Sequence, residues 1–338
     1  MGKPMTTRRR LARRVSIGLL VIAALLGATW LRDRRPRPIT VNAGRFPEEL
    51  VYARSTDDVV NGGVLFTSSR RGDQSPAVIW VHGWGVNFYS PTYTAIGRAL
   101  AARGTTMLSV NTRMHDIGTS ATYRGGRRVR GGGYWGIQSE QDLDIAAWVD
   151  FAAQHGYPEV VLAGHSAGWA AVAAYRVRTQ DPRVVGVVLA SGAVGPLRPQ
   201  RDPDLLAQAR RLVDAGTGDD LIRLPNRNFP SFISAANLLD QANTPAALLD
   251  FFGVEERDPG VARLGCPILA FFGTRGDVGG EDDLEVIRSA PRRLSIDTLR
   301  VEAVMIDGAD HMYTGEEARV AGVIGDWVRR VVVAGVRR

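Results

Sequence analysis

The sequence predicts an α/β fold in which helices cover both faces of a doubly wound, mostly parallel sheet. From about residue 63, short apolar runs typical of buried strands alternate with longer segments of helical character. Three of the apolar runs end in turns that carry a serine, an aspartate and a histidine. Because ligands bind at the carboxyl edge of such a sheet, we expect these three side chains to meet there.

The expected elements alternate along the chain. Strands are expected at residues 63–66, 77–81, 106–110, 160–163, 184–190, 267–272 and 301–306. Helices are expected at residues 91–103 and 138–154 and from the turn at 164–168 to Arg178. The one cysteine, Cys266, excludes an intramolecular disulfide and is expected to pack as a small core residue.

Two insertions interrupt this alternation. Residues 112–137 are expected to form a glycine-rich loop at the edge of the candidate site, and the loop carries Arg113, Arg124, Arg127, Arg128 and Arg130. These arginines either contact an anionic substrate or lipid headgroups, or belong to a solvated loop.

The second insertion, residues 195–264, is expected to form a helical cap with helices at 205–213, 231–241 and 244–252. Its apolar side chains either line an acyl pocket or close the cap's own small core. They are Phe229, Phe232, Leu238, Leu239, Phe251 and Phe252.

Residues 164–168 read Gly-His-Ser-Ala-Gly and follow the apolar run 160–163 directly. A G-x-S-x-G string between a strand and a helix is typical of a sharp turn that exposes the serine hydroxyl. A hydroxyl is a weak nucleophile until a base removes its proton, so the motif requires a histidine and a carboxylate elsewhere in the chain. We predict Ser166 as a nucleophile, His311 as its base and Asp277 as the acid that orients His311.

Other candidates for base and acid have structural explanations. Among the histidines, His82 and His165 lie in turns where buried hydrogen bonds are expected, His155 closes a helix, and His115 lies in the loop, where it could also touch substrate. Among the carboxylates, Glu281, Asp282 and Asp283 are expected in the first turn of a helix, and Asp310 is expected to brace its own loop. His311 and Asp277 are preferred because each follows a strand directly.

These motifs resemble those of the α/β-hydrolase superfamily, and the resemblance spans about residues 51–333. The order Ser166, Asp277, His311 is the family's order of nucleophile, acid and base. An earlier string, Val-Ile-Trp-Val-His-Gly-Trp-Gly at residues 78–85, is similar to the family's strand ending in His-Gly. The resemblance implies a serine esterase or lipase-like enzyme whose oxyanion hole is made by the backbone amides of Trp84 and Ala167. One departure is that Asp277 lies four residues after Gly273, where many members have three.

Two classes of function follow. The first is a serine hydrolase that cleaves an ester or related acyl bond in a small-molecule substrate through an acyl-enzyme. The second is an inactive or differently reacting member of the fold that serves as a membrane-associated binding module. Ser166 argues against dehalogenase and epoxide hydrolase chemistry, which needs a carboxylate at that position. No cofactor or metal is implied, since the chain lacks a P-loop, a dinucleotide fingerprint and a metal-ligand cluster.

The N-terminal segment differs in character from the remaining chain. A basic tail at residues 1–14 precedes an uncharged apolar stretch at 15–31, followed by a linker at 32–45 and the hydrolase domain at 46–338. The stretch predicts a hydrophobic helix that anchors an extracytoplasmic enzyme in a membrane, or a signal peptide that is cleaved on export. Residues 1–38 contribute +9 to the formal net charge of +7, which leaves −2 for the other residues. This balance gives no support for nucleic-acid binding by the domain.

Overall fold

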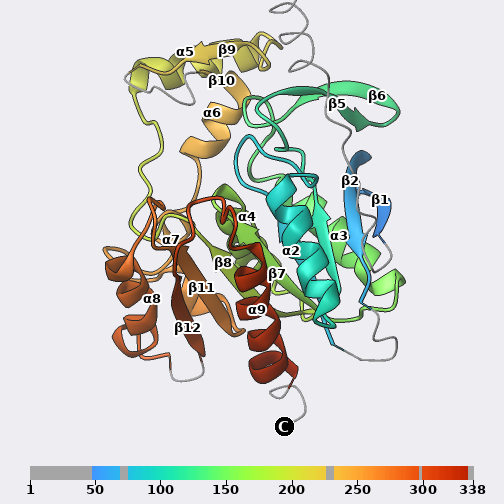
Figure 1. Ribbon diagram of the computed structural model, residues 1–338. Helices are drawn as coiled ribbons and strands as arrows, with labels where there is room; N and C mark the ends of the chain where they lie inside the picture. The colour runs from blue at the N-terminus through green and yellow to red at the C-terminus, as the bar shows by residue number, and fades with distance from the viewer. Residues whose placement is uncertain (1–47, 69–74, 226–231, 297–298, 334–338) are drawn as a thin grey trace, which may run out of the picture. The chain divides into compact units, whose positions relative to one another are not determined.

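The computed structural model describes residues 48–68, 75–225, 232–296 and 299–333 (Figure 1). All of them belong to the second of the two units into which the chain divides, Gly44–Arg338. The predicted hydrophobic helix at residues 15–31, its basic tail and the linker after it lie outside the described residues. Among the residues that are described, no helix is both long enough and apolar enough to cross a membrane.

A ten-stranded sheet runs through the described residues, in the order β12-β11-β8-β7-β3-β4-β2-β5-β6, with β1 paired to β2. The parallel strands are β3 (Ala77–Val81), β4 (Met107–Val110), β7 (Val160–His165), β8 (Val184–Ala190), β11 (Ile268–Gly273) and β12 (Val301–Ile306). The antiparallel strands are β1 (Glu48–Arg54), β2 (Val59–Phe66), β5 (Thr119–Arg124) and β6 (Arg127–Gly131). The mostly parallel sheet is therefore confirmed, whereas β1, β5 and β6 were not predicted.

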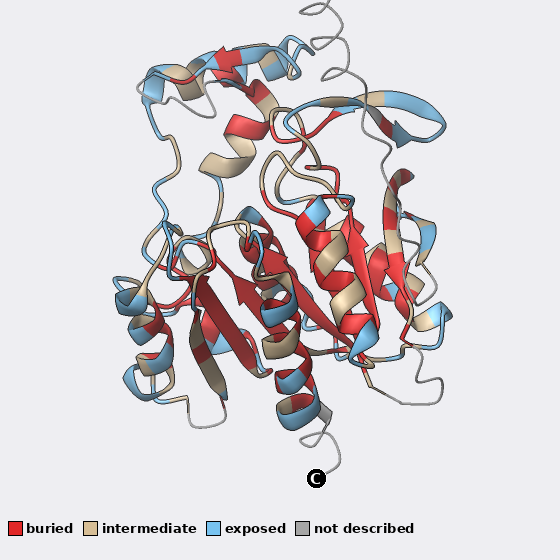
Figure 2. Ribbon diagram, viewed as in Figure 1, coloured by how far each residue is buried: buried red, intermediate tan, exposed pale blue. Residues whose placement is uncertain are grey.

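Helices cover both faces of this sheet (Figures 1 and 2). One face carries α2 (Pro91–Ala102) and α9 (Glu317–Trp327), which runs into a π-helical segment, Val328–Val333. The other face carries α3 (Gln141–Gln154), α4 (Ala167–Thr179) and α8 (Glu281–Arg293).

Strand β3 shows how helices on both faces of the sheet affect the sequence of a strand. Its Val78 and Trp80 pack in the core beneath α2 and α9, and its Ile79 and Val81 pack in the core beneath α3 and α4. Successive side chains of a strand point to opposite faces, so a strand covered on both sides must be apolar throughout. The unbroken apolar runs in the sequence follow from this requirement.

The predicted cap follows β8 and precedes β11 in the chain, and its segment from α5 to α6 lies above the sheet in Figure 1. It contains α5 (Pro203–Asp214), β9 (Leu221–Arg223), β10 (Phe232–Ser234), α6 (Ala235–Ala242), α7 (Ala246–Leu249) and a 3₁₀ turn at Gly260–Arg263. The helix expected at residues 231–241 begins later, because Ser234 caps α6 by accepting the amide of Asn237. The helix expected at 244–252 is a single turn.

The apolar residues of the cap divide between two cores. Leu238 packs with Ile222, Ile233 and other cap residues in a small separate cluster. Phe251 and Phe252 pack instead in the core of the main sheet, where Phe252 meets the ring of Trp169 edge to face. Phe232 is exposed, Leu239 packs against the cap cluster, and Phe229 lies outside the described residues.

Residues 112–137 were predicted to be a loop, and this prediction is wrong for their middle part. Strands β5 and β6 form a hairpin closed by Gly125 and Gly126, whose φ angles are 56° and 79°. A two-residue turn with both φ angles positive favours glycine and matches the twist of the paired strands. The paired glycines in the sequence were the local signal for this hairpin.

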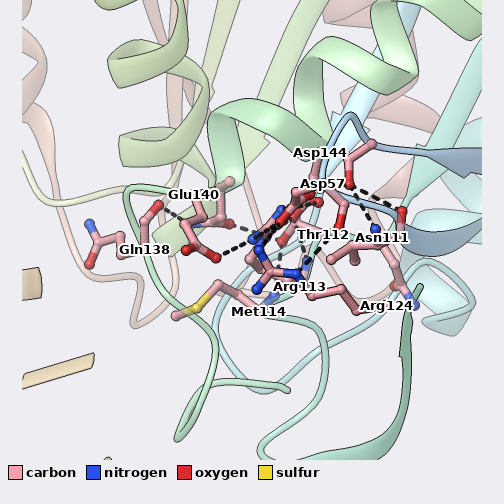
Figure 3. Close-up of polar contacts among 12 residues, drawn as sticks. Asp57, Asn111, Thr112, Arg113, Met114, Arg124, Gln138, Glu140 and Asp144 are labelled. Carbon is pink, nitrogen blue, oxygen red and sulfur yellow. Dashed lines mark hydrogen bonds and ion pairs between the residues drawn. The ribbon is translucent and has the colours of Figure 1, made fainter. Parts of the chain in front are cut away.

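Neither alternative predicted for the arginines of this segment, contact with an anionic ligand or a place in a solvated loop, holds for Arg113. Only 4% of its surface is exposed, and its guanidinium donates to the carboxylates of Asp57, Glu140 and Asp144 (Figure 3). A buried charge is costly unless it is paired, so Arg113 is committed to these internal ion pairs. They join the turn between β1 and β2, the segment after β4 and the start of α3.

Replacing Arg113 with methionine should lower the free energy of unfolding by about 3 to 5 kcal/mol, because Asp144 would stay buried without a cation. Urea unfolding of both proteins measures this change. The control is Arg54→Met, which breaks the exposed pair with Asp58 and should cost less than about 1 kcal/mol. Equal losses in the two variants would contradict the structural role given to Arg113.

Candidate active site

Ser166 lies at the turn between β7 and α4, with a φ of 53° and a ψ of −119°. Backbone segments pass very close to one another around it. A Cβ atom on Gly164 would lie 2.3 Å from the carbonyl oxygen of Gly168, and one on Gly168 would lie 2.5 Å from that of His82. Both positions therefore require glycine, which explains the spacing of the motif.

The structure brings the three predicted residues together. His311 Nδ1 lies 2.8 Å from Asp277 Oδ1, and His311 Nε2 lies 3.2 Å from Ser166 Oγ. With Nδ1 donating to the carboxylate, the unprotonated Nε2 of the neutral ring faces the serine hydroxyl. This geometry allows His311 to accept the proton of Ser166.

The side chain of Asp277 is fully buried and still held as an anion. Burial opposes its ionisation, but hydrogen bonds from His311, Ser191 and the amides of Gly273 and Val278 outweigh burial, so its pKa lies below the ordinary value. The amide of Gly273 donates to Oδ2 of Asp277 at 2.7 Å. This hydrogen bond closes the turn formed by the four-residue spacing between Gly273 and Asp277. Asp277 is the carboxylate in contact with His311.

The competing carboxylates have other contacts. Glu281, Asp282 and Asp283 lie in the first turn of α8, and Asp283 accepts the amide of Gly280. Asp310 accepts the amides of Met312 and Thr314, so it braces its own loop as predicted.

Two supporting residues were missed from the sequence. Ser191, buried at the end of β8, donates to Asp277 Oδ2 and accepts a hydrogen bond from the hydroxyl of Tyr313. Ser191 could have been found, because it follows a predicted strand at the same edge as the other three residues. Tyr313 gave no comparable signal, because its hydrogen bond to Ser191 joins two segments that are distant in the chain.

His82 orients the peptide that contains the predicted oxyanion donor Trp84. Its Nε2 accepts the amide of Thr112, so Nδ1 carries the proton and donates to the carbonyl of Gly83 at 2.8 Å. That carbonyl and the amide of Trp84 belong to one peptide group and point in opposite directions. The Trp84 amide therefore points away from His82.

The second predicted donor, Ala167, is the first residue of α4. Amides in the first turn of a helix have no acceptor within the helix and lie at the positive end of its dipole. Trp84, Ala167 and Ser166 line the same cavity. Two amides beside the Ser166 hydroxyl fit the requirement for a site that stabilises a developing oxyanion.

His115 and His155 lie outside this constellation. His115 pairs with Asp116 at 2.8 Å, and the exposed His155 contacts the carbonyl of Phe151 at the end of α3. Neither lines the cavity beside Ser166.

The cavity beside Ser166 has a volume of about 340 Å³. The insertion contributes Leu197, Leu248, Leu249 and Phe251 to its wall, and α4 contributes Trp169 and Ala173. Gln138 and Gln141 are polar groups in this largely apolar lining. A cavity of this size and chemistry suits a small, mostly apolar ligand with a few polar atoms. Among the residues described, no cluster of His, Cys, Asp and Glu is arranged to hold a metal ion.

Acid should destabilise the fold through two buried histidines, His82 and His165. Burial lowers the pKa of each from 6.5 to about 4. Between these values the unfolded chain binds protons that the folded chain does not, so stability is full above pH 6.5 and falls as the pH drops to 4. Each ring should account for about 3 kcal/mol, measured as urea unfolding at a series of pH values.

The variant His165→Gln should reduce this dependence on pH, and His155→Gln, which alters an exposed ring, should leave it unchanged. A wild-type protein whose unfolding free energy is constant from pH 6.5 to 4 would contradict the burial of two neutral rings.

Solved structures of similar fold include several esterases. Est1E from Butyrivibrio proteoclasticus with bound ferulic acid is similar in structure, with a TM-score of 0.57 and 15% sequence identity, over 84% of this chain and 99% of that one. The esterase domain of a Rhodothermus marinus protein gives 0.51 at 20% identity, over 84% and 98%. A thermophilic esterase from Thermogutta terrifontis gives 0.53 at 17% identity, over 84% and 99%.

At these identities the structural likeness shows the fold alone, and no curated protein matches the chain in sequence. The family model described as "Alpha/beta hydrolase family" matches residues 78–323, a range that includes Ser166, Asp277 and His311. The chain therefore belongs to the alpha/beta hydrolase family.

Proposed function

We propose that this chain is a serine hydrolase that cleaves an ester bond through an acyl-enzyme intermediate, with Ser166, His311 and Asp277 as its catalytic triad. The observation that carries the proposal is the continuous hydrogen-bond chain from Ser166 Oγ through His311 to Asp277, next to a largely apolar cavity that Ser166 lines. A buried carboxylate, a neutral imidazole and a serine in this order are the parts that nucleophilic acyl transfer needs.

Acylation begins when Ser166 Oγ attacks the carbonyl carbon of the ester and its proton passes to His311 Nε2. The carbonyl π electrons move to the oxygen, and the amides of Trp84 and Ala167 stabilise the resulting oxyanion. Asp277 stabilises the imidazolium that forms. When the tetrahedral intermediate collapses, the bond to the alkoxy oxygen breaks, and the alcohol leaves with the proton from His311.

Deacylation repeats these steps with water as the nucleophile. His311 accepts a proton from the water, which attacks the acyl carbon, and the amides of Trp84 and Ala167 again hold the oxyanion. The bond from the acyl carbon to Ser166 Oγ then breaks, and His311 returns its proton to the serine. The products are a carboxylic acid and the regenerated enzyme.

The substrate we propose is an ester of a small, mostly apolar acid. The cavity of about 340 Å³ lies at the small end of the range for ligand pockets. Structures of similar fold contain ferulic acid in Est1E and malate in the Thermogutta esterase. The first substrate panel should therefore contain aromatic esters, with short dicarboxylic esters as the polar comparison.

A fluorophosphonate probe should label the wild-type protein at Ser166, because the probe reacts with an activated serine. Ser166→Ala should abolish labelling and lower kcat by about 10⁴- to 10⁶-fold, and His311→Ala should cause a loss of similar size. The double variant should be little worse than either single variant, since the two residues act as a unit. Mass spectrometry of the labelled peptide and ester hydrolysis by purified protein measure these outcomes.

Ser289→Ala is a matched control, since it removes a hydroxyl from α8 and should keep full labelling. Asp277→Asn should lower kcat by about 10⁴-fold, whereas Asp283→Asn should not. Labelling that persists in Ser166→Ala would refute the nucleophile. A neutral Asp277→Asn together with an essential Asp282 or Asp283 would refute the acid.

We also propose that the apolar stretch at residues 15–31 attaches the chain to a membrane, with the catalytic domain on the extracytoplasmic side. Basic residues flank the stretch on both sides, and the larger cluster precedes it. The absence of a clear small-residue cleavage site near Ala28 favours an anchor over a cleaved signal.

Deleting residues 1–38 should give a soluble enzyme that keeps its activity on small esters, because every proposed catalytic residue lies beyond Val81. The full-length protein should sediment with membranes and resist extraction by high salt, which removes proteins held only by charge. Sedimentation and the N-terminal sequence of the mature protein are the measurements. A soluble mature protein that begins after Ala28 would show that the segment is a cleaved signal.

A further inference from the structure

His165 takes no part in the proposed chemistry, although it is almost fully buried next to the site. Its ring centroid lies 4.9 Å from that of His311 and within 5.6 Å of those of Tyr93 and Tyr313. Both of its ring nitrogens have partners: Nδ1 lies 2.7 Å from the hydroxyl of Tyr93, and Nε2 lies 2.8 Å from the backbone carbonyl of His311.

These two contacts determine where the proton of His165 lies. A carbonyl oxygen only accepts hydrogen bonds, so Nε2 must carry the proton and donate to His311. Burial lowers the pKa of His165 to about 4, so the ring is neutral near pH 7 and its Nδ1 is an acceptor. The hydroxyl of Tyr93 therefore donates to Nδ1.

Tyr93 extends this chain to the loop of the proposed oxyanion hole. Its hydroxyl oxygen accepts the amide of Gly83 at 3.2 Å, while its hydrogen goes to His165. The carbonyl of the same Gly83 is held by His82. Both polar backbone groups of Gly83, the residue before Trp84, are thereby occupied.

We propose that Tyr93 and His165 are positioning residues, which hold the backbone of the base His311 at a set distance from the oxyanion loop at Gly83 and Trp84. The inference rests on the proposed function. These hydrogen bonds run from the Gly83 amide through the Tyr93 hydroxyl and the His165 ring to the His311 carbonyl, and they join the loop after β3, α2, β7 and the loop after β12.

This link matters because the base and the oxyanion donors act on one tetrahedral centre at the same time. They reside on segments that are more than 200 residues apart in the chain, so only tertiary contacts can set their separation. A displacement of about 1 Å at a reacting group can cost about 100-fold in rate. A neutral His165 also adds no charge beside the imidazolium that forms on His311.

The test compares Tyr93→Phe with Tyr175→Phe. Each variant removes one buried tyrosine hydroxyl, but that of Tyr175 binds Asp181 outside the cavity. Tyr93→Phe should lower kcat by about 10- to 100-fold and change KM by less than about threefold, because it alters positioning rather than substrate binding. Tyr175→Phe should lose similar stability and keep its kcat.

Two variants of His165 test its two hydrogen bonds separately. In His165→Gln the side-chain amide reaches the position of Nε2 and can still donate to the His311 carbonyl. In His165→Asn it ends near the position of Nδ1 and can serve only Tyr93. The glutamine variant should therefore keep more of the wild-type kcat than the asparagine variant. A purely structural role would give kcat values that follow stability instead.

The rate of fluorophosphonate labelling separates failure of this inference from failure of the proposed function. A wild-type protein that is not labelled at Ser166 refutes the function. If the wild type is labelled and Tyr93→Phe reacts at the same rate, the function stands and this inference is overturned.

A second measurement uses the folded wild-type protein alone. The ¹⁵N shifts of His165 near pH 7 should show a neutral ring protonated on Nε2. A proton on Nδ1 would remove the donor to His311 and overturn the proposal.

Discussion

The arrangement of the site depends on the close approach of the turn at Ser166 to the end of β3. Gly168 lies against the carbonyl groups of Val81 and His82, at a distance that a Cβ atom would prevent. This contact sets the first turn of α4 beside the loop that begins at Gly83. The proposed nucleophile, the Ala167 amide and the Trp84 amide consequently share one cavity, so a change in this backbone contact would move all three.

Two buried histidines hold backbone segments on two sides of the site through opposite tautomers. His82 carries its proton on Nδ1 and binds the Gly83 carbonyl, whereas His165 carries it on Nε2 and binds the His311 carbonyl. Each tautomer is set by a backbone partner that can only donate or only accept. The site therefore contains three histidines in different settings: the ring of His311 faces the Ser166 hydroxyl, and the other two rings hold the backbone around it.

The buried ion pairs around Arg113 lie next to residues that line another part of the cavity. They attach the segment after β4 to the start of α3, and the neighbouring Met114, Gln138 and Gln141 line the cavity. The cap is tied to this region as well, because Ser139 binds Asp240 and the amide of Ser234 donates to the carbonyl of Tyr134. Residues 112–139 thus connect the core of the sheet to the insertion that covers the site.

The sequence by itself determined the parallel sheet and the positions of Ser166, Asp277 and His311 at its edge. These features follow from local patterns, since a strand buried on both faces must be apolar and the turn after it carries the functional side chain. The tertiary structure alone decided the partners of Arg113, the contacts of Tyr93 and Tyr313, and the division of the cap's aromatic residues between two cores. Their contacts join segments far apart in the chain, where no periodicity or spacing records which side chains will meet.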